Sequence, residues 1–405
     1  MERKERLQDV DFQLPPELLE LQAVVRQIVR GKIEPRAREI DDTGDYPQDI
    51  FDVFRDAGLL GLSVPDQYGG SGAGILGLVV AVEEVAKVSN TCALMLLLSR
   101  LPLGPLLTLG SEEQRQAYVP GIASGARRAA FGLSEPQAGS DVSGMRTRAV
   151  PDTEGGWRLS GTKCWMSGIA QADWFTVFAK VSQPSSAPTQ GRGHDNIAAF
   201  IVERDQPGVS VGSLDRKMGV RGIDTGQLHL DDVRVPAAAK VGDGGFATAM
   251  SALNAVRPVV AARGIGLAEG ALMYSTRYVE QRDAFGSKVA DFQSIQWEIA
   301  KLAVDIEAAR LLTYRAAAMI DSGKFGKEAA PYLSMAKYHA TELAVRASGL
   351  SVQLLGAAGY MKDHLTELFY RDARQLTIVE GTSQVQLGLI ARAVLDRRVW
   401  WDDKP

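Results

Sequence analysis

One carboxylate stands out near the end of the chain, in the segment TIVEGTSQVQLG at residues 377–388. Glu380 lies between a β-branched run and a Gly-Thr-Ser turn, where a carboxylate aimed at a substrate proton can serve as a general base. The same segment fits a helix start, because Thr382 or Ser383 is a typical N-cap residue and Ser383 with Gln386 fits a capping box. Acids are also favoured near a helix N-terminus by the helix dipole. The segment alone therefore leaves a solvated acid and a catalytic base as open interpretations.

Two other segments combine turn, hydroxyl and aromatic residues. FGLSEPQAGSDVSG at 131–144 has the chain's densest cluster of turn and hydroxyl residues, and the backbone N–H groups of such a turn can hold a polar ligand edge. GTKCWMSG at 161–168 fits a strand that presents Trp165 and, two residues later, Ser167 on one face. An aromatic plate beside a hydroxyl suits a planar cofactor, although an ordinary loop and a core tryptophan are the commoner explanations.

Several well-known catalytic motifs do not fit the chain. GIGLAEG at 264–270 has one residue too many for a dinucleotide fingerprint and follows a helical pattern rather than a strand. Small residues for close helix packing explain it better. The sequence has no GxxxxGK[ST], GxSxG or HExxH pattern, and its four histidines are isolated from one another. A nucleophilic triad and a zinc site therefore have no local support.

The elements that must position these residues fall into three zones. Residues 1–125 have a helical pattern, residues 126–240 consist of short β-rich pieces, and residues 241–405 return to apolar positions every three or four residues. We expect an α+β multidomain fold: an N-terminal α-helical domain, a middle antiparallel β-barrel or sandwich, and a C-terminal four-helix bundle. The Pro-, Ser- and Gly-rich stretch at 181–195 is expected to form an exposed hairpin loop.

Composition narrows the classes of partner and compartment. The 405 residues are 45% apolar and 23% charged with a net charge of −4, and no block of like charges calls for nucleic acid or a membrane surface. The longest apolar runs fall short of the roughly 20 residues of a membrane span. The N-terminus lacks an apolar signal-type region, and two cysteines do not make a disulfide framework. We expect a cytoplasmic protein without a membrane span.

Seven ordered segments resemble the acyl-CoA dehydrogenase family, over about residues 15–400. The matching segments are LSEPQAGSDVSG (133–144), GTKCWMSG (161–168), KMGVRGIDTGQLHLDDVRVP (217–236), QRDAFG (281–286), FQSIQ (292–296), QLLGAAGY (353–360) and RDARQLTIVEGTSQVQ (371–386). The helix, sheet and helix zones agree with the architecture of that family.

The resemblance implies an activity and a set of site residues. Members oxidise an acyl-CoA thioester to the trans-2-enoyl-CoA with FAD as hydride acceptor, and Glu380 matches the base that removes the α-proton while flavin N5 takes the β-hydride. Some subfamilies place the base near Ala255, where this chain has no carboxylate. The positions that match FAD contacts are Leu133, Ser134, Trp165, Ser167, Arg282, Phe285, Gln293, Gln353, Gly356, Thr382 and Gln384. The positions that match substrate contacts are Ser140, Asn254 and Arg257.

The resemblance also implies partners. An electron-transfer flavoprotein is the expected electron acceptor, and a homotetramer or homodimer is the expected assembly, with part of the FAD site lying across a subunit interface. The chain departs from the family pattern at two positions beside the flavin, since Gln137 replaces a common Gly and Gly168 a common Asn. Arg100 falls in a region that lines the acyl pocket in the family. A surface position is the simpler expectation for an arginine, and an inward one would meet a polar or carboxylated acyl tail.

Two alternatives compete with acyl-CoA dehydrogenation. One is an oxygen-using flavoenzyme of the same fold, an acyl-CoA oxidase or a flavin monooxygenase. The other is a non-catalytic relative that keeps only the fold. A variant of the leading hypothesis acts on a carrier-protein thioester or a modified CoA thioester, and the sequence does not indicate the length or branching of the acyl chain.

Overall fold

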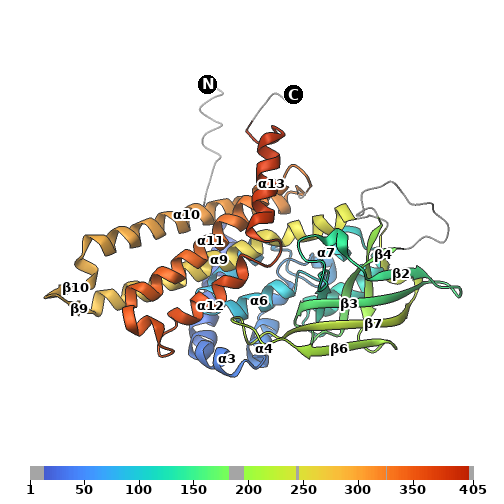
Figure 1. Cartoon of the computed structure of the whole chain (residues 1–405), viewed down its shortest axis with the longest axis horizontal. Coiled ribbons are helices and arrows are strands. Elements are labelled where there is room, and N and C mark those ends of the chain that lie inside the picture. The colour runs from blue at the N-terminus through green and yellow to red at the C-terminus, as the bar shows by residue number, and fades with distance from the viewer. Residues whose placement is uncertain (1–12, 182–195, 243–245, 325, 401–405) are drawn as a thin grey trace.

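The chain folds into two helical domains with a β-sheet domain between them in sequence, as predicted (Figure 1). The computed structural model describes residues 13–181, 196–242, 246–324 and 326–400, with side chains omitted for 246–252. All but the first residue of the predicted hairpin loop at 181–195 lies outside the described residues. No helix in the described part of the chain is both long enough and apolar enough to cross a membrane.

The N-terminal domain consists of short helices, and two of those in the described residues have a side-chain N-cap. Ser111 and Gln114 form a capping box in which each backbone N–H donates to the other side chain, at 2.9 and 3.2 Å. Ser89 caps the helix that begins at Asn90, since Cys92 N donates to Ser89 Oγ at 3.2 Å. The helices are α2 (Pro16–Ile28), α3 (Ala37–Thr43), α4 (Gln48–Asp56), α5 (Gly74–Ala86), α6 (Asn90–Leu98), α7 (Gly104–Leu109) and α8 (Glu112–Ala123).

The middle domain is built on one eight-stranded sheet in the order β6-β7-β3-β2-β4-β5-β8, with β1 also paired to β4. Most neighbours are antiparallel, as predicted, but β1 and β2 both pair with β4 in parallel. The sheet is therefore mixed, because β4 runs in the same direction as these two neighbours. The strands are β1 (Ala129–Gly132), β2 (Arg148–Pro151), β3 (Trp157–Ser167), β4 (Trp174–Val181), β5 (Ile197–Glu203), β6 (Val209–Leu214), β7 (Thr225–Val235) and β8 (Lys240–Val241).

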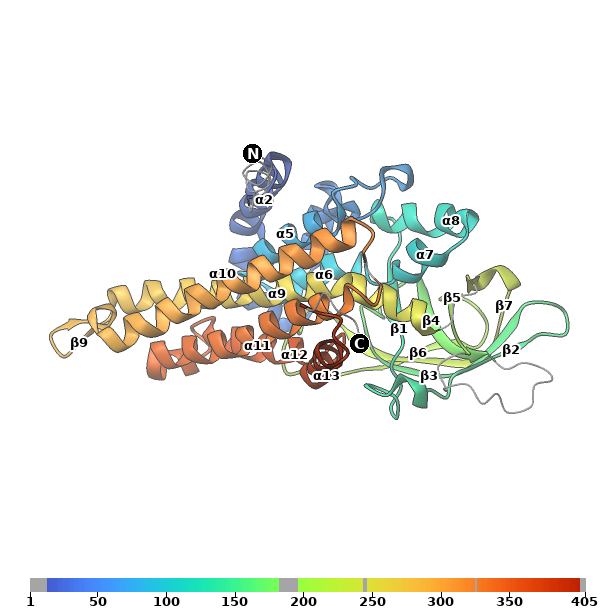
Figure 2. The ribbon, with the colours of Figure 1, turned by 90° about the horizontal axis from the view of Figure 1, so that it is seen from above.

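Long helices dominate the C-terminal domain, where α9, α10 and α11 run alongside one another (Figures 1 and 2). A small hairpin, β9 paired with β10, joins α9 to α10 at the end of the bundle farthest from the β domain. The elements are α9 (Phe246–Gln281), β9 (Asp283–Ala284), β10 (Ser287–Lys288), α10 (Gln293–Asp321), α11 (Ala330–Leu355), α12 (Thr366–Leu376) and α13 (Ser383–Leu395).

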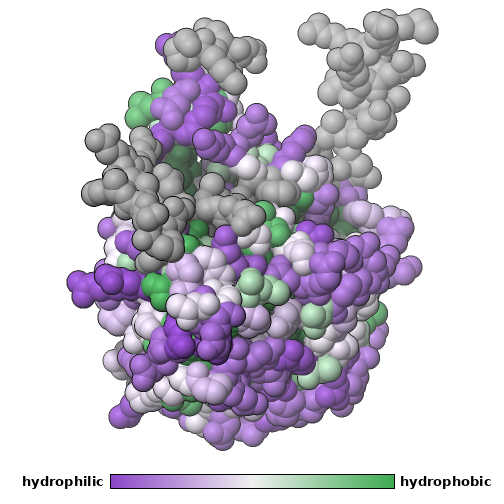
Figure 3. Space-filling model, turned by 90° about the vertical axis from the view of Figure 1, so that its right-hand side faces the viewer, coloured by the Kyte–Doolittle hydropathy of each residue, from purple (hydrophilic) through white to green (hydrophobic). Residues whose placement is uncertain are grey.

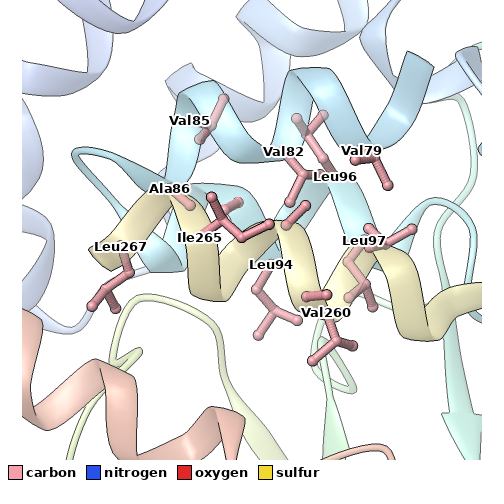
Figure 4. Close-up of a cluster of buried hydrophobic side chains, with 14 of the residues drawn as sticks. Val79, Val82, Val85, Ala86, Leu94, Leu96, Leu97, Val260, Ile265 and Leu267 are labelled. Atoms are coloured by element: carbon pink, nitrogen blue, oxygen red, sulfur yellow. The ribbon is translucent and has the colours of Figure 1, made fainter. Parts of the chain in front are cut away.

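A continuous core joins the two helical domains. Figure 4 shows side chains of α5, α6 and α9 packed together, including Val82, Leu94 and Val260. The close approach of α9 to α5 depends on two glycines. A Cβ at Gly266 would lie 2.2 Å from the carbonyl oxygen of Glu83, and a Cβ at Gly270 would lie 1.9 Å from that of Lys87. The GIGLAEG segment is therefore a close-packing motif, as the sequence indicated.

Apolar side chains remain exposed on α10 at intervals of seven residues. Trp297, Val304 and Leu311 have exposed fractions of 59%, 69% and 42%. A seven-residue interval keeps them on one side of the helix. By contrast, the face of the molecule at the β-domain end is mainly hydrophilic, with only small scattered apolar areas (Figure 3).

Candidate active site

Glu380 lies in the connection between α12 and α13 with an unusual backbone conformation. Its φ is +54°, a left-handed value that is uncommon for a residue other than glycine, and Gly381 follows with φ +92°. The Gln386 side-chain amide donates to the carbonyl oxygens of Glu380 and Gly381, both at 3.1 Å. Lys337 Nζ on α11 donates to the Gly381 carbonyl at 2.9 Å. Side chains from two helices therefore fix the backbone that carries the carboxylate.

The helix start after Glu380 differs from the predicted capping box. Thr382 is the N-cap, since Val385 N donates to its Oγ1 at 3.3 Å. The pairing of Ser383 with Gln386 was wrong, because the Ser383 hydroxyl donates to Glu342 on α11 and the Gln386 amide is used on the connecting turn. The expected cap residue therefore ties α13 to α11, and the expected partner supports the Glu380 turn.

The Glu380 carboxylate is not a solvated surface acid. Its Oε2 is buried and has no hydrogen-bond partner in the described residues, although the residue as a whole is half-buried. Burial raises the pKa of Glu380 to about 7, while the positive charges of Lys337, Arg257 and Arg263 act in the opposite direction. The carboxyl group is thus poised between its two protonation states near neutral pH.

Three buried cations from α9 and α11 surround this carboxyl group. Arg257 Nη1 donates to Ser334 Oγ at 3.3 Å, while its Nε has no partner in the described residues. Arg263 is held by Asn90 and Gln375, each at 2.9 Å. Burial lowers the pKa of Arg257 to about 10 despite the opposing charge of Glu380.

Lys337 was not among the residues predicted from the sequence. It is fully buried, and burial lowers its pKa to about 8, with Glu380 opposing that shift. A signal was present, because Ser334, Lys337 and Thr341 place buried polar groups at helical spacing on an otherwise apolar face of α11. Arg263 carried no comparable signal. The predicted substrate residue Asn254 lies one turn before Arg257 and is buried, and Ala255 beside it is also buried.

In the β domain, the two predicted flavin segments lie against each other. Cys164 N donates to the Ser134 carbonyl at 3.0 Å, and Lys163 Nζ donates to the Leu133 carbonyl at 3.2 Å and to Glu135 Oε1 at 2.7 Å. Lys163 is fully buried, so this buried ion pair supports the Leu133–Ser134 turn from below. Ser140 is exposed on the loop that follows.

Trp165 occupies an irregularity in β3 that the sequence did not predict. The register between β3 and β7 shifts between Lys163 and Met166, and Trp165 has φ +56°. A bulge of this kind re-aims a side chain. Trp165 keeps 58% of its surface exposed, and Ser167 follows two residues later, half-buried. The result is an uncovered indole beside hydroxyl and backbone donors.

The remaining predicted FAD positions are divided between two places. Thr382 and Gln384 follow the Glu380 turn, at the start of α13. The others gather at the opposite end of the helical bundle, around the β9–β10 hairpin and the end of α11 (Figure 1). Arg282 follows the end of α9, about 37 Å along the helix axis from Arg257 at 1.5 Å per residue. Within one chain, the structure does not bring Arg282, Phe285, Gln293, Gln353 and Gly356 to the Glu380 site.

Comparisons with known proteins bear on this arrangement. Three family models match nearly the whole chain: the acyl-CoA dehydrogenase N-terminal domain at residues 15–126, the middle domain at 130–233 and the C-terminal domain at 243–395. The chain belongs to the acyl-CoA dehydrogenase family. It is therefore an oxidoreductase, and the family to which it belongs is FAD-dependent.

Relatives and solved structures of this family cover almost all of the chain. The chain is 39% identical to acryloyl-CoA reductase (NADH) of Anaerotignum propionicum, over 98% of each chain. It is 38% identical to the caffeyl-CoA reductase–Etf complex subunit CarC of Acetobacterium woodii, over 89% of this chain and 93% of the relative. Butyryl-CoA dehydrogenase from Megasphaera elsdenii superimposes with a TM-score of 0.90 at 34% identity, over 95% of this chain and 100% of that one. A glutaryl-CoA dehydrogenase from Mycobacterium smegmatis in complex with FADH2 gives a TM-score of 0.87 at 26% identity, over 98% of each chain.

The residues of this family member fit a bound flavin. The Trp165 indole is exposed beside the Leu133–Ser134 turn, whose backbone is anchored from the buried side by Lys163. At the far end of the bundle, Phe285 is 98% exposed with φ +52°, and both the conformation and the exposure are uncommon for a large apolar residue. Both features are what an aromatic cofactor with a long polar tail would use.

Proposed function

We propose that this acyl-CoA dehydrogenase removes one hydrogen from each of the α and β carbons of an acyl-CoA thioester, giving the trans-2-enoyl-CoA, with Glu380 as the base. The observation that carries the proposal is the buried, unpartnered carboxylate oxygen of Glu380 on a turn fixed by Lys337 and Gln386. A carbon-bound proton next to a thioester is weakly acidic, so its removal requires a base in a fixed position. FAD, when bound, supplies the acceptor for the hydrogen lost from the β carbon.

The chain's own residues would act as follows. Glu380 takes the α-proton and becomes neutral, which relieves the burial of its charge. Lys337 and Arg257 stabilise the ionised carboxylate before the reaction, without forming a hydrogen bond to it that would block the proton. Asn254 and Arg257 on α9 and Ser140 on the β-domain loop would hold the thioester and its CoA. Leu133, Ser134, Trp165 and Ser167 would hold the flavin ring.

The pKa of Glu380 suits catalysis in either direction. A group with a pKa of about 7 can accept or donate a proton at neutral pH, and neither transfer has a large free-energy cost. Similarity to an acryloyl-CoA reductase favours the reductive direction as a second candidate. In that direction Glu380 would donate the α-proton that it removes in the oxidation.

The decisive experiment is an anaerobic titration of the purified flavoprotein with acyl-CoA esters of increasing length. We expect one class of ester to bleach the flavin absorbance, and Glu380→Gln to slow bleaching by about 10²–10⁴-fold while retaining FAD. Glu113→Gln, which makes the same change at an exposed position on α8, is the matched control and should behave like the wild type. If no ester bleaches the flavin, or if Glu380→Gln bleaches at the wild-type rate, the proposed function is wrong. Rapid reoxidation by air with release of peroxide would instead favour the oxygen-using alternative.

An electron-transfer flavoprotein is the proposed acceptor in the oxidative direction. Support comes from the similarity to CarC, whose name places it in a complex with such a flavoprotein. The test is the rate at which the substrate-reduced enzyme reoxidises when an electron-transfer flavoprotein is added without oxygen. A rate no faster than with buffer alone would contradict this assignment.

We also propose a homotetramer in which a second copy completes each FAD site. The separation of Arg282 and Phe285 from Glu380 supports this, as do the exposed Trp297, Val304 and Leu311 of α10. Val304→Asp should reduce the assembly measured by analytical ultracentrifugation and release FAD together. Loss of assembly with full FAD retention would refute the shared site.

A further inference from the structure

Arg100 is a buried guanidinium without a partner. The residue is 8% exposed, and its Nε and Nη1 are buried with no hydrogen-bond partner in the described residues. The prediction of a surface position was therefore wrong, because the end of α6 is covered by packing that its sequence does not show. The acid whose charge acts on Arg100 is Asp321, and the two form no ion pair in the described part of the chain. Both oxygens of Asp321 already accept the backbone N–H groups of Ile75 and Leu76, at 2.7 and 2.9 Å.

The absence of a partner is unusual even among the buried arginines of this protein. Arg263 has two hydrogen bonds, and Arg257 has one together with the charge of Glu380. A buried charge without a partner destabilises the fold by several kcal/mol. Buried unsatisfied polar groups in native proteins therefore call for an explanation, and a ligand that is not yet bound is one.

The arrangement of α6 and α9 places Arg100 near the Glu380 site. Asn90, at the start of α6, contacts Arg263 at 2.9 Å, and the two helices run in opposite directions (Figure 4). At 1.5 Å per residue, the end of α6 at Leu98 is then level with about residue 255 of α9, in the turn that carries Asn254 and Arg257.

The β-domain side confirms this location for the end of α6. A Cβ built on Gly168, next to the predicted flavin residue Ser167, would lie 3.3 Å from Leu98 Cδ1. Arg100 follows Leu98 by two residues. The backbone at Arg100 therefore lies near the junction where α9, the end of α6 and the β3–β4 turn meet.

We propose that Arg100 binds a carboxylate carried by the acyl group of the substrate, at the end remote from the thioester. This inference rests on the proposed function and names its substrate class, an acyl thioester with a terminal carboxylate. Arg100 follows α6 and has no hydrogen bond or ion pair with Glu380 in the described residues, so we expect the anion it binds to lie away from the α carbon. A planar guanidinium can bind a carboxylate through two parallel hydrogen bonds, here one from Nη2 and the other from the unpartnered Nε or Nη1. The CoA phosphates are a poorer match, because they are the most hydrated part of the substrate and Arg100 is buried.

Equilibrium binding tests the inference separately from catalysis. The Glu380→Gln protein, loaded with FAD, would be titrated with glutaryl-CoA and with uncharged pentanoyl-CoA, which have equal chain length, and binding followed by the change in flavin absorbance. Adding Arg100→Met should weaken glutaryl-CoA binding by about 100-fold and leave pentanoyl-CoA binding unchanged or tighter. Arg115→Met, which removes a partly exposed arginine on α8, is the control and should change neither.

Two further measurements make the test decisive. Pantetheine thioesters of the same two acids lack the CoA nucleotide, so the 100-fold effect should persist with them, and its disappearance would assign Arg100 to the CoA phosphates and overturn the inference. Arg100→Met should also raise or preserve the melting temperature, because it removes an uncompensated buried charge. A large fall in melting temperature with equal loss for both acyl groups would show a structural role and overturn the inference. If the selective binding effect appears but no thioester bleaches the wild-type flavin, the proposed function fails and the binding site stands.

Discussion

The protonation of Glu380 should control the rate of flavin reduction across the neutral pH range. Burial raises the pKa of Glu380 to about 7 from an ordinary value of 4.5. Only the ionised form can accept the α-proton, so activity should rise as pH increases through this pKa. With a pKa of 7, about 9% of the carboxyl groups are ionised at pH 6 and about 91% at pH 8. We therefore expect the second-order rate constant of reduction to rise about tenfold between these pH values.

An unperturbed carboxyl group would give a different profile. With a pKa of 4.5, about 97% of the groups are already ionised at pH 6, and the rate would be nearly flat. The assay is anaerobic stopped-flow reduction of the flavin at low acyl-CoA concentration, from pH 5.5 to 8.5, so that the free enzyme is titrated and the electron acceptor is not involved. A flat profile between pH 6 and 8 would refute the assignment of a buried base.

Lys337 provides a second, signed test of the same reasoning. Its positive charge lowers the pKa of Glu380, so Lys337→Met should move the midpoint of the profile to higher pH and reduce the rate at pH 7. Lys362→Met is the control. Its lysine lies in the loop before α12 with 67% of the side chain exposed, so its removal should leave the midpoint unchanged. A midpoint that falls in Lys337→Met would show that the burial and charge argument for Glu380 is incorrect.

Elsewhere in the molecule, packing and burial predict the outcome of four other substitutions. Lys163→Met leaves the buried Glu135 without its ammonium partner, which should cost roughly 3–5 kcal/mol of stability and release FAD, as measured by thermal unfolding and flavin absorbance. Gly266→Ala should destabilise by about 1–3 kcal/mol in urea unfolding because its Cβ would meet a carbonyl of α5, whereas Gly388→Ala on α13, with no atom within 4 Å, should stabilise slightly. Phe285→Ser should weaken FAD retention without lowering the stability of the apoprotein, because the ring is almost fully exposed.

The sequence predicted the fold better than it predicted the surroundings of Glu380. The three zones, the close-packing role of GIGLAEG and the N-cap at Thr382 depend on local patterns, which a single sequence displays. Lys337 and Arg263 act on Glu380 only because α9 and α11 pack against the α12–α13 connection. The polar spacing on α11 marks Lys337 as unusual but does not show which residue it faces, and Arg263 has no such spacing. The bulge at Trp165 was missed for a related reason, since a register shift depends on the partner strand as well as on the strand itself.

The distribution of unpartnered buried charges argues that this region is built for a ligand. Five charged side chains in the described residues have a buried atom without a hydrogen bond. Asp152 forms ion pairs with two arginines and Asp224 accepts a backbone N–H, so these two are otherwise supported within the protein. The other three are Arg100, Arg257 and Glu380. Arg257 and Glu380 act on each other, and the antiparallel pairing of α6 with α9 brings Arg100 toward them. Random imperfections of packing would not gather in this way, whereas a site that must accept a charged, polar substrate has to leave such groups open at the expense of stability. Binding of a thioester should therefore stabilise the protein by more than its contact area alone predicts, because it removes three desolvation penalties at once.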